Sequence, residues 1–93
     1  MLNGNSSFVK GSIKGRVISN KHVPIKDATI MITGNSSPHN DIALLTDSNG
    51  LYQLDELEPG LYSILISKKK YISQIKNVNV FAGKESKLNF ILK

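Results

Sequence analysis

The sequence predicts an all-β, seven-stranded antiparallel sandwich. Short runs rich in β-branched residues recur roughly every ten positions from Gly11 onward, and Gly, Pro, Asn or Asp bounds each run. No stretch keeps the 3.6-residue period of an amphipathic helix. The chain has 93 residues, of which 40% are hydrophobic and 20% charged. A chain of this size and composition is expected to fold as one domain around one core.

The first two expected strands follow from alternating side chains. In residues 12–19, Ile13 and Val17 fall on one face and the basic residues fall on the other. Pro24 marks the turn that follows, because its ring fixes φ and its nitrogen cannot donate a hydrogen bond to a sheet. Residues 28–33 alternate in the same way, so each strand should bury one face.

A turn with defined chemistry separates the next two strands, which are expected at residues 42–46 and 51–54 after a polar loop. Asp47 can accept hydrogen bonds from backbone amides two residues further on, Asn49 tolerates a left-handed conformation, and Gly50 supplies a positive φ. Together these residues predict a tight hairpin.

The last three expected strands are bounded in the same manner. Pro59 and Gly60 form the turn before a strand at residues 61–67, which alternates regularly. A sixth strand is expected at residues 71–80. A turn containing glycine then leads to the seventh strand at residues 87–92.

The inward faces of these strands predict a single core. Tyr52 and Tyr62, each two residues after its glycine, should enter the core at matching points of neighbouring strands, and Leu57 belongs to the same motif. The predicted core consists of Ile13, Val17, Ala28, Ile30, Ile32, Tyr52, Leu54, Leu57, Tyr62, Ile64, Ile66, Val78, Val80, Leu88 and Phe90. This set uses most of the apolar residues, so little is left to line a ligand pocket.

The beginning of the chain differs from the rest. Residues 1–10 contain Asn, Gly and Ser without periodicity and predict a flexible leader before a domain at residues 11–93. These ten residues lack the charged start and the apolar centre of a signal peptide, and no segment reaches the about 18 apolar residues of a membrane span. If the protein is exported, we expect the signal to lie outside this sequence.

Composition excludes several kinds of chemistry. The chain has no cysteine, so it has no disulfide, thiolate metal site or cysteine nucleophile. The net charge of +5 is spread along the chain except for the cluster Lys68, Lys69 and Lys70. Nucleic-acid-binding domains usually combine such a cluster with aromatic residues or a basic helix. We therefore interpret the cluster as a solvated hairpin turn, and expect a monomer with no nucleic-acid partner.

Four separated blocks of sequence resemble the carboxypeptidase regulatory-like domain family. The blocks are GRV at residues 15–17, PIKDATI at 24–30, TDSNGLY at 46–52 and LEPGLY at 57–62. They stand in the order and spacing of the family. The resemblance implies a transthyretin-like, Greek-key sandwich without catalytic residues or cofactor, which serves as an accessory domain in prokaryotic surface or secreted proteins.

The chain departs from the pattern of this family at one position. The family often has glycine immediately before the tyrosine of strand six, whereas here Lys70 precedes Tyr71. This difference leaves the conformation of the turn at residues 68–70 open.

A calcium site is the first alternative to weigh. Asp47, Asn49 and Gly50, followed by Glu56, match part of a calcium-binding loop. The first ligand position of that pattern holds Leu45, and no helices flank the loop. The hairpin interpretation is therefore preferred, and no metal ligand is assigned.

Zinc and nucleophilic catalysis are also not expected. His22 and His39 lie in predicted loops and lack a carboxylate at ligand spacing. Ser36 and Ser37 lie near His39 and Asp41, but these residues share one polar loop that has no oxyanion-hole motif. No residue is therefore assigned to catalysis, and the chain is not expected to be an enzyme.

The sequence instead favours a structural or interaction module within a larger surface or secreted protein, whose partners are neighbouring domains or another protein. A carbohydrate-binding module is the alternative. Sugar sites usually present exposed aromatic side chains. Phe8 and Phe81 are the candidates, because the tyrosines and Phe90 are assigned to the core.

A covalent bond between Lys14 and Asn89 is a third possibility, since related pilin sandwiches join such residues with the help of a buried acid. In those domains the acid lies in the strand after the Pro-Gly turn. This chain has Ile64, Leu65 and Ile66 there. The cross-link is therefore not expected.

Overall fold

The computed structural model describes residues 9–35 and 43–93. This part of the chain contains strands and no helix, and hence no helix that could span a bilayer. The strands are β1 (Gly11–Ser19), β2 (Thr29–Asn35), β3 (Ala43–Leu45), β4 (Leu51–Leu57), β5 (Gly60–Ser67), β6 (Gln74–Val80), β7 (Glu85–Lys87) and β8 (Phe90–Leu92).

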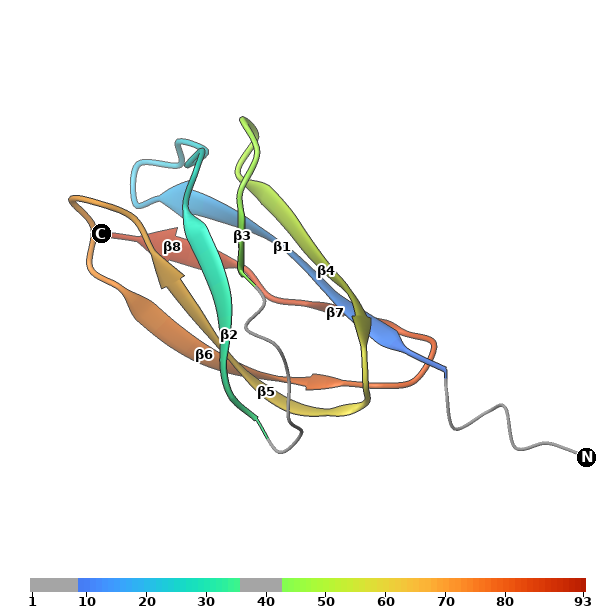
Figure 1. Ribbon diagram of the computed structural model, residues 1–93. Helices are drawn as coiled ribbons and strands as arrows, with labels where there is room; N and C mark the ends of the chain where they lie inside the picture. The colour runs from blue at the N-terminus through green and yellow to red at the C-terminus, as the bar shows by residue number, and fades with distance from the viewer. Residues whose placement is uncertain (1–8, 36–42) are drawn as a thin grey trace, which may run out of the picture.

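Two sheets pack face to face (Figure 1). Sheet I contains β1 at its centre, with β4 on one edge and β7 and β8 on the other. Sheet II has the order β3-β2-β5-β6. The predicted all-β sandwich is confirmed, and most expected strands are found within a few residues of their predicted bounds.

The last strand differs from the expectation. An antiparallel strand was predicted at residues 87–92, but the extended run begins at Glu85, is divided into β7 and β8, and lies parallel to β1. The turn after β6 places the chain on the far side of β1, and the run then follows β1 in the same direction. The alternation of side chains does not reveal whether a strand runs parallel or antiparallel to its neighbour, because the alternation is the same in both cases.

The break between β7 and β8 lies where the chain passes over Gly15. A Cβ atom at Gly15 would come within 1.7 Å of the carbonyl oxygen of Leu88, so a side chain does not fit here. The hydroxyl group of Tyr52 donates to the same carbonyl oxygen. The amide of Leu88 donates to the carbonyl of Lys14 at 3.0 Å. The polar groups of Leu88 therefore keep partners although the strand is interrupted.

The core lies between the two sheets. Tyr52, Leu57 and Tyr62 are buried, as are all other members of the predicted set except Val78 and Leu88, which are partly buried and pack against it. Tyr52 and Tyr62 enter the core from β4 and β5 in different sheets, and not from neighbouring strands as expected. Ile25 and Leu92 are buried in addition. Ile25 lies outside any strand, so its burial depends on how its connection crosses the end of the sandwich and not on alternation.

The turn between β5 and β6 has the conformation that glycine favours. Lys70 has a φ of 78°. The amide of Tyr71 donates to the carbonyl of Lys68 at 3.0 Å, which closes the turn. Lysine at the position where related chains often have glycine therefore adopts the left-handed conformation, and β6 begins at Gln74, later than the expected residue 71.

Lys70→Gly should raise the free energy of unfolding by up to about 1 kcal/mol. The left-handed conformation costs a residue with a Cβ about 1–2 kcal/mol, and the larger loss of chain entropy at glycine offsets part of that gain. Urea denaturation measures the change. Lys69→Gly is the matched control, since Lys69 has no positive φ, and it should lower the stability. Equal losses in both variants would contradict this account of the turn.

Candidate functional site

The sequence blocks that begin at Pro24 and Thr46 lie side by side at one end of the sandwich (Figure 1). The chain passes from β1 in sheet I to β2 in sheet II through residues 20–28. It returns from β3 to β4 through residues 46–50. The amide of Thr46 donates to the carbonyl of Ala28, and the amide of Asp27 donates to the carbonyl of Thr46, both at 3.0 Å. The two connections between the sheets are therefore hydrogen-bonded to each other.

The Thr46 side chain adds two further bonds to this junction. Its hydroxyl group donates to the carbonyl of Ile25 at 2.6 Å and accepts from the amide of Ala28 at 2.9 Å. Thr46 is 2% exposed, so no solvent replaces these bonds. Sequence reasoning placed Thr46 at the end of a strand and gave it no role. The sequence feature that could have indicated its role is a hydroxyl-bearing residue at the border between an apolar strand and a tight turn.

Asp47 caps the turn between β3 and β4. Its Oδ1 atom accepts from the amides of Asn49 at 2.8 Å and Leu51 at 2.9 Å. The amide of Gly50 donates to the Asp47 carbonyl at 2.9 Å. Asp47 and Gly50 thus form a turn as their residue types suggest, whereas Asn49 does not adopt a positive φ and takes part through its amide. The predicted hairpin is wrong, because β3 pairs with β2 in sheet II and β4 pairs with β1 in sheet I. The turn instead carries the chain between the sheets, and the Asp47 Oδ1 atom is engaged by the backbone.

Gly50 is required at this turn for two reasons. Its φ is 75°, which residues with a Cβ atom rarely adopt. A Cβ atom would also lie 2.3 Å from the carbonyl oxygen of Val17. The amide of Val17 donates to the Gly50 carbonyl at 2.7 Å, so the turn packs directly on β1.

The Pro59-Gly60 turn is held by Tyr62. The Tyr62 hydroxyl group donates to the carbonyl of Glu58 at 2.6 Å. Burial raises the pKa of Tyr62, and the charge of Glu58 raises it further. Burial also raises the pKa of Tyr52. Both phenols therefore stay protonated at neutral pH and act as hydrogen-bond donors to the backbone.

The structure gives the calcium hypothesis no ligand set. Asp47 caps its own turn, while Glu56 lies within β4. Across residues 9–35 and 43–93, no three His, Asp or Glu side chains lie close enough together to hold a metal ion. His22 is exposed in a turn, with a φ of 65°. Ser36, Ser37, His39 and Asp41, the residues weighed for a nucleophilic triad, lie outside the described residues.

Lys14 and Asn89 are exposed and line one shallow hollow on the outer side of sheet I. The side-chain oxygen of Asn89 accepts from the amide of Arg16 at 2.9 Å. In β5, Ile64 and Ile66 face the core. The acid that would catalyse a bond between Lys14 and Asn89 is therefore missing from β5.

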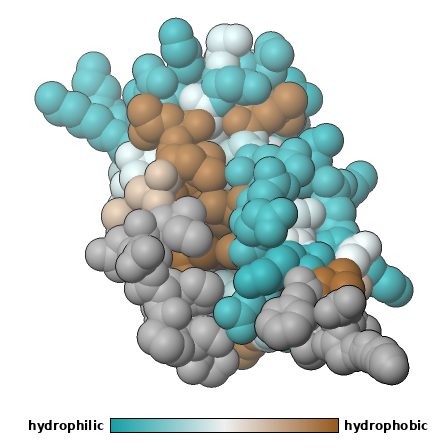
Figure 2. All heavy atoms as spheres, turned by 45° about the vertical axis from the view of Figure 1, so that its right-hand side comes forward, coloured by the Kyte–Doolittle hydropathy of each residue, from teal (hydrophilic) through white to brown (hydrophobic). Residues whose placement is uncertain are grey.

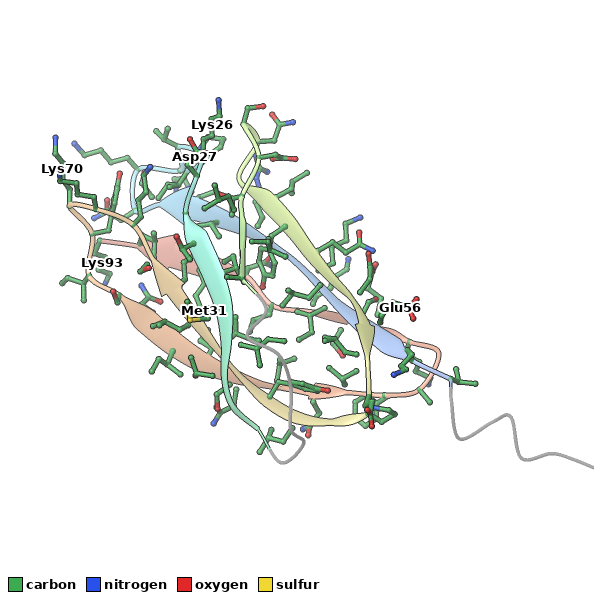
Figure 3. All side chains as sticks on the ribbon, in the orientation of Figure 1. Lys26, Asp27, Met31, Glu56, Lys70 and Lys93 are labelled. Carbon is green, nitrogen blue, oxygen red and sulfur yellow. The ribbon has the colours of Figure 1, made fainter. Side chains whose placement is uncertain are left out.

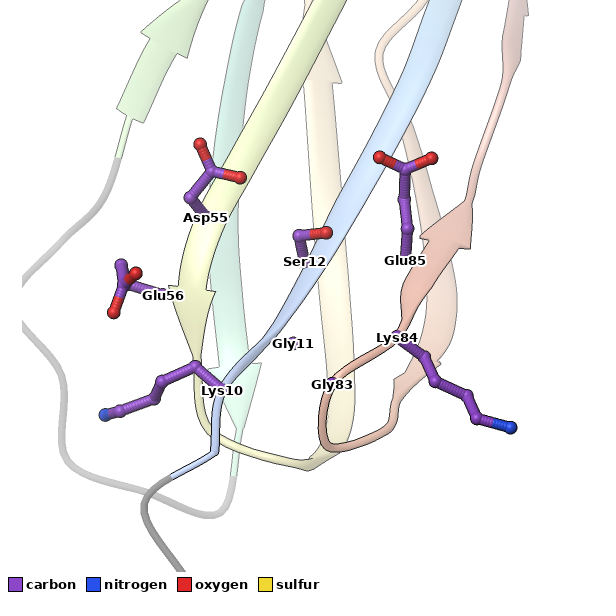
Figure 4. Close-up of a pocket in the computed structure, with 8 residues that line it drawn as sticks. All are labelled: Lys10, Gly11, Ser12, Asp55, Glu56, Gly83, Lys84 and Glu85. Atoms are coloured by element: carbon purple, nitrogen blue, oxygen red, sulfur yellow. The ribbon is translucent and has the colours of Figure 1, made fainter. Parts of the chain in front are cut away.

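A larger hollow lies at the opposite end of sheet I from the Asp47 turn (Figure 4). Asp55, Ser12 and Glu85 extend from the adjacent strands β4, β1 and β7, and Lys10 and Lys84 lie at the rim. Its volume is about 520 Å³. The lining mixes charges of both signs on an open surface, so it presents no enclosed apolar pocket for a small molecule.

Apolar atoms gather in a band on the side where β3 and β4 form the free edges of the two sheets (Figure 2). A hollow there is lined by Leu44, Leu45, Leu51 and Tyr52, together with polar side chains. Leu45 is 57% exposed. On the opposite side, where β6 lies near β7 and β8, side-chain hydrogen bonds bridge the two sheets.

The outer faces of the two sheets differ in charge. The outer face of sheet I includes the charged residues Lys14, Arg16, Asp55, Glu85 and Lys87. In the described part of sheet II, the outward positions are uncharged: Thr29, Met31, Thr33, Ala43, Leu45, Leu61, Ser63, Leu65, Ser67, Ile75, Asn77 and Asn79. Ala43, Met31, Leu65 and Ile75 form one apolar row across all four strands, and Met31 is labelled in Figure 3.

A family model described as "Carboxypeptidase regulatory-like domain" matches residues 12–93. The comparison with curated protein sequences gives no match.

Solved structures share the fold. The Bacillus anthracis TIE protein shares 22% sequence identity with this chain, and its structure matches with a TM-score of 0.75. The match covers 90% of this chain and 16% of that one. The major pilin subunit BcpA of Bacillus cereus is 16% identical, with a TM-score of 0.71 and coverages of 91% and 30%. A 3-chlorocatechol 1,2-dioxygenase from Rhodococcus opacus is 13% identical, with a TM-score of 0.72 and coverages of 98% and 62%. The chain thus spans less than two thirds of each of these proteins.

Gly50→Ala should lower the free energy of unfolding by about 2–4 kcal/mol, because the side chain meets both an unfavourable φ and the backbone of β1. Gly60→Ala is the matched variant. Gly60 also has a positive φ, of 152°, but a Cβ atom there would meet nothing within 4 Å. Its cost should be about 1–2 kcal/mol from conformation alone. Thermal or urea unfolding compares the two. A larger loss at Gly60 than at Gly50 would contradict the close packing of the turn on β1.

Thr46→Val should cost about 2–4 kcal/mol, because it keeps the shape of the side chain and leaves the Ile25 carbonyl and the Ala28 amide without their hydroxyl partner in a buried site. Thr33→Val provides the control. Thr33 lies on the outer face of sheet II with a longer bond of 3.4 Å to the Ser63 carbonyl, and should change stability by less than about 0.5 kcal/mol. Similar changes in the two variants would show that the Thr46 hydroxyl group does not hold the connections together.

Proposed function

Because the chain belongs to the carboxypeptidase regulatory-like domain family, we propose that it is a non-catalytic structural and interaction module in a larger surface or secreted protein. One observation carries this proposal. The polar side chains of the family motif bind the chain's own backbone: Thr46, Asp47, Tyr52 and Tyr62 each do so. Their chemistry is used to build the fold.

In this proposal, residues 11–93 form the domain and residues 1–10 lead into it. β1 begins at Gly11, and β8 ends beside the far end of β1, with Ser19 opposite Leu92. The two ends of the domain are therefore separated by the length of β1, which is roughly 30 Å for a nine-residue strand. A domain with this geometry can be inserted in line between two other domains.

The outer face of sheet II, which is uncharged in its described part, is the surface proposed for contact with a neighbouring domain of the same polypeptide. Four strands about 4.8 Å apart, with outward residues about 7 Å apart along each strand, offer roughly 400–500 Å². Stable complexes between separate proteins bury about 800 Å² on each partner. Interfaces between domains of one chain begin at about 600 Å² in total, so tethering makes this smaller face sufficient. The free domain is proposed to be a monomer.

Carbohydrate binding is the weaker alternative. Phe81 is 57% exposed, whereas Tyr52, Tyr62 and Phe90 are buried. Tyr71 is partly buried and packs against the core. Within residues 9–35 and 43–93, Phe81 is thus a single exposed ring, and sugar sites usually present a platform of such rings. Phe8 lies outside the described residues.

A screen against ester, peptide and glycoside substrates tests the proposal directly, and no turnover is expected. Turnover that disappears in His39→Ala or Asp41→Ala would contradict it.

Titration of the same sample with oligosaccharides tests the carbohydrate-binding alternative. Saturable binding that Phe81→Ala abolishes would favour a carbohydrate-binding module.

Light scattering at micromolar concentration should give the mass of one chain. A stable dimer that Leu65→Lys dissociates would show that the sheet II face binds a second copy instead of a neighbouring domain.

A further inference from the structure

The first and last strands of the domain are parallel neighbours. Ser12 to Lys14 pair with Glu85 to Lys87, and Val17 to Ser19 pair with Phe90 to Leu92. The chain enters at the start of β1 and leaves at the end of β8. Opposite forces on the two ends therefore slide β1 along β7 and β8 instead of peeling them apart.

Direction matters because interstrand hydrogen bonds run across the strands. When neighbouring strands are peeled from one end, their bonds break one after another, each at a small cost. When the strands are slid along their axes, all the bonds are loaded together and must fail together. We propose that this domain carries tension between its two ends, and that the pairing of β1 with β7 and β8 is the element that resists it. The inference rests on the proposed in-line role and adds a mechanical one.

In addition to the ladder bonds of the paired strands, four hydrogen bonds join β1 and the residue after it to this run. The amides of Ser12 and Asn20 donate to the carbonyls of Lys84 and Leu92, and the amide of Leu88 donates to the carbonyl of Lys14, each at 3.0 Å. The fourth falls at the break between β7 and β8, where the Asn89 side chain accepts from the amide of Arg16 at 2.9 Å. Asn89 therefore continues the pairing across the two residues that leave the sheet.

The other edge of the same run is bonded to sheet II. Lys76 Nζ donates to the Asn89 carbonyl at 2.8 Å, and Gln74 Nε2 donates to the Ile91 carbonyl at 2.6 Å. The amide of Ile72 donates to the carbonyl of Lys93 at 2.9 Å, close to the end of the chain shown in Figure 3. Tension at Lys93 is thus shared between both sheets.

The core opposes sliding as well. Val17 of β1 and Phe90 of β8 are register partners, and both are 0% exposed. Sliding β8 along β1 would move the Phe90 ring through close-packed surroundings, and such movement is unfavourable in a protein interior. Hydrogen bonds and packing therefore resist the same displacement.

Single-molecule pulling tests this inference with two attachment geometries. The chain has no cysteine, so introduced cysteines are unique attachment points. Lys10→Cys with Lys93→Cys loads β1 against β8 by sliding. Lys21→Cys with Lys93→Cys loads the same strands from one end. We expect the rupture force at equal loading rate to be at least about twofold higher in the first geometry, since its bonds fail together. Equal forces, or a lower force in the first geometry, would overturn the proposal.

Asn89→Ala measures how much the Asn89 side-chain bond, at the break between β7 and β8, contributes to the rupture force. It should lower the rupture force in the sliding geometry and leave the peeling force nearly unchanged, because peeling from Lys93 meets the β8 bonds first. Asn79→Ala, on an exposed position of β6, is the control and should change neither. No effect of Asn89→Ala on the sliding force would contradict its role. The pulling experiment and the substrate screen are independent measurements. A failed mechanical prediction therefore leaves the non-catalytic assignment standing, and detected turnover leaves the mechanical prediction standing.

Discussion

Thr46 begins the connection from β3 to β4, and its hydroxyl and backbone groups bind Ile25, Asp27 and Ala28 in the connection from β1 to β2. A sandwich needs such a contact because packing between two apolar faces does not by itself fix where the connections cross. Gly50 extends the junction to Val17 of β1. The register of β4 on β1 and the burial of Ile25 both follow from this junction, and the core is assembled around it.

Local chemistry explains why much of the fold could be predicted. Alternation identifies which residues face the core, and the Asp47 turn depends on properties of a few adjacent residues. The division of the last strand could not be predicted in the same way, because it depends on the close approach of Leu88 to Gly15, which is remote in sequence. A glycine inside an expected strand was the available signal. Thr46 was missed for a similar reason, since its partners are about twenty residues away.

The candidate site follows the same division. Asp47 and Gly50 form a turn as their types suggest, but the turn joins two sheets and not a hairpin, and it serves the fold. The properties of the surface could be derived only from the register of the strands. The described part of the sheet II face is uncharged although the chain carries twelve basic residues. Strand order also places the first and last strands side by side in parallel. A partner surface and a response to tension are therefore properties of the topology, whereas catalysis would have needed particular side chains brought together.

Native-state amide hydrogen exchange tests the central role of the junction most directly. The amides of Val17, Ala28 and Thr46 all donate within it. If the junction holds the two sheets together, these amides should exchange only through global unfolding, with the same free energy as the most protected amides of β5. Exchange of these three amides through a local opening at clearly lower free energy, while β5 stays protected, would contradict the account.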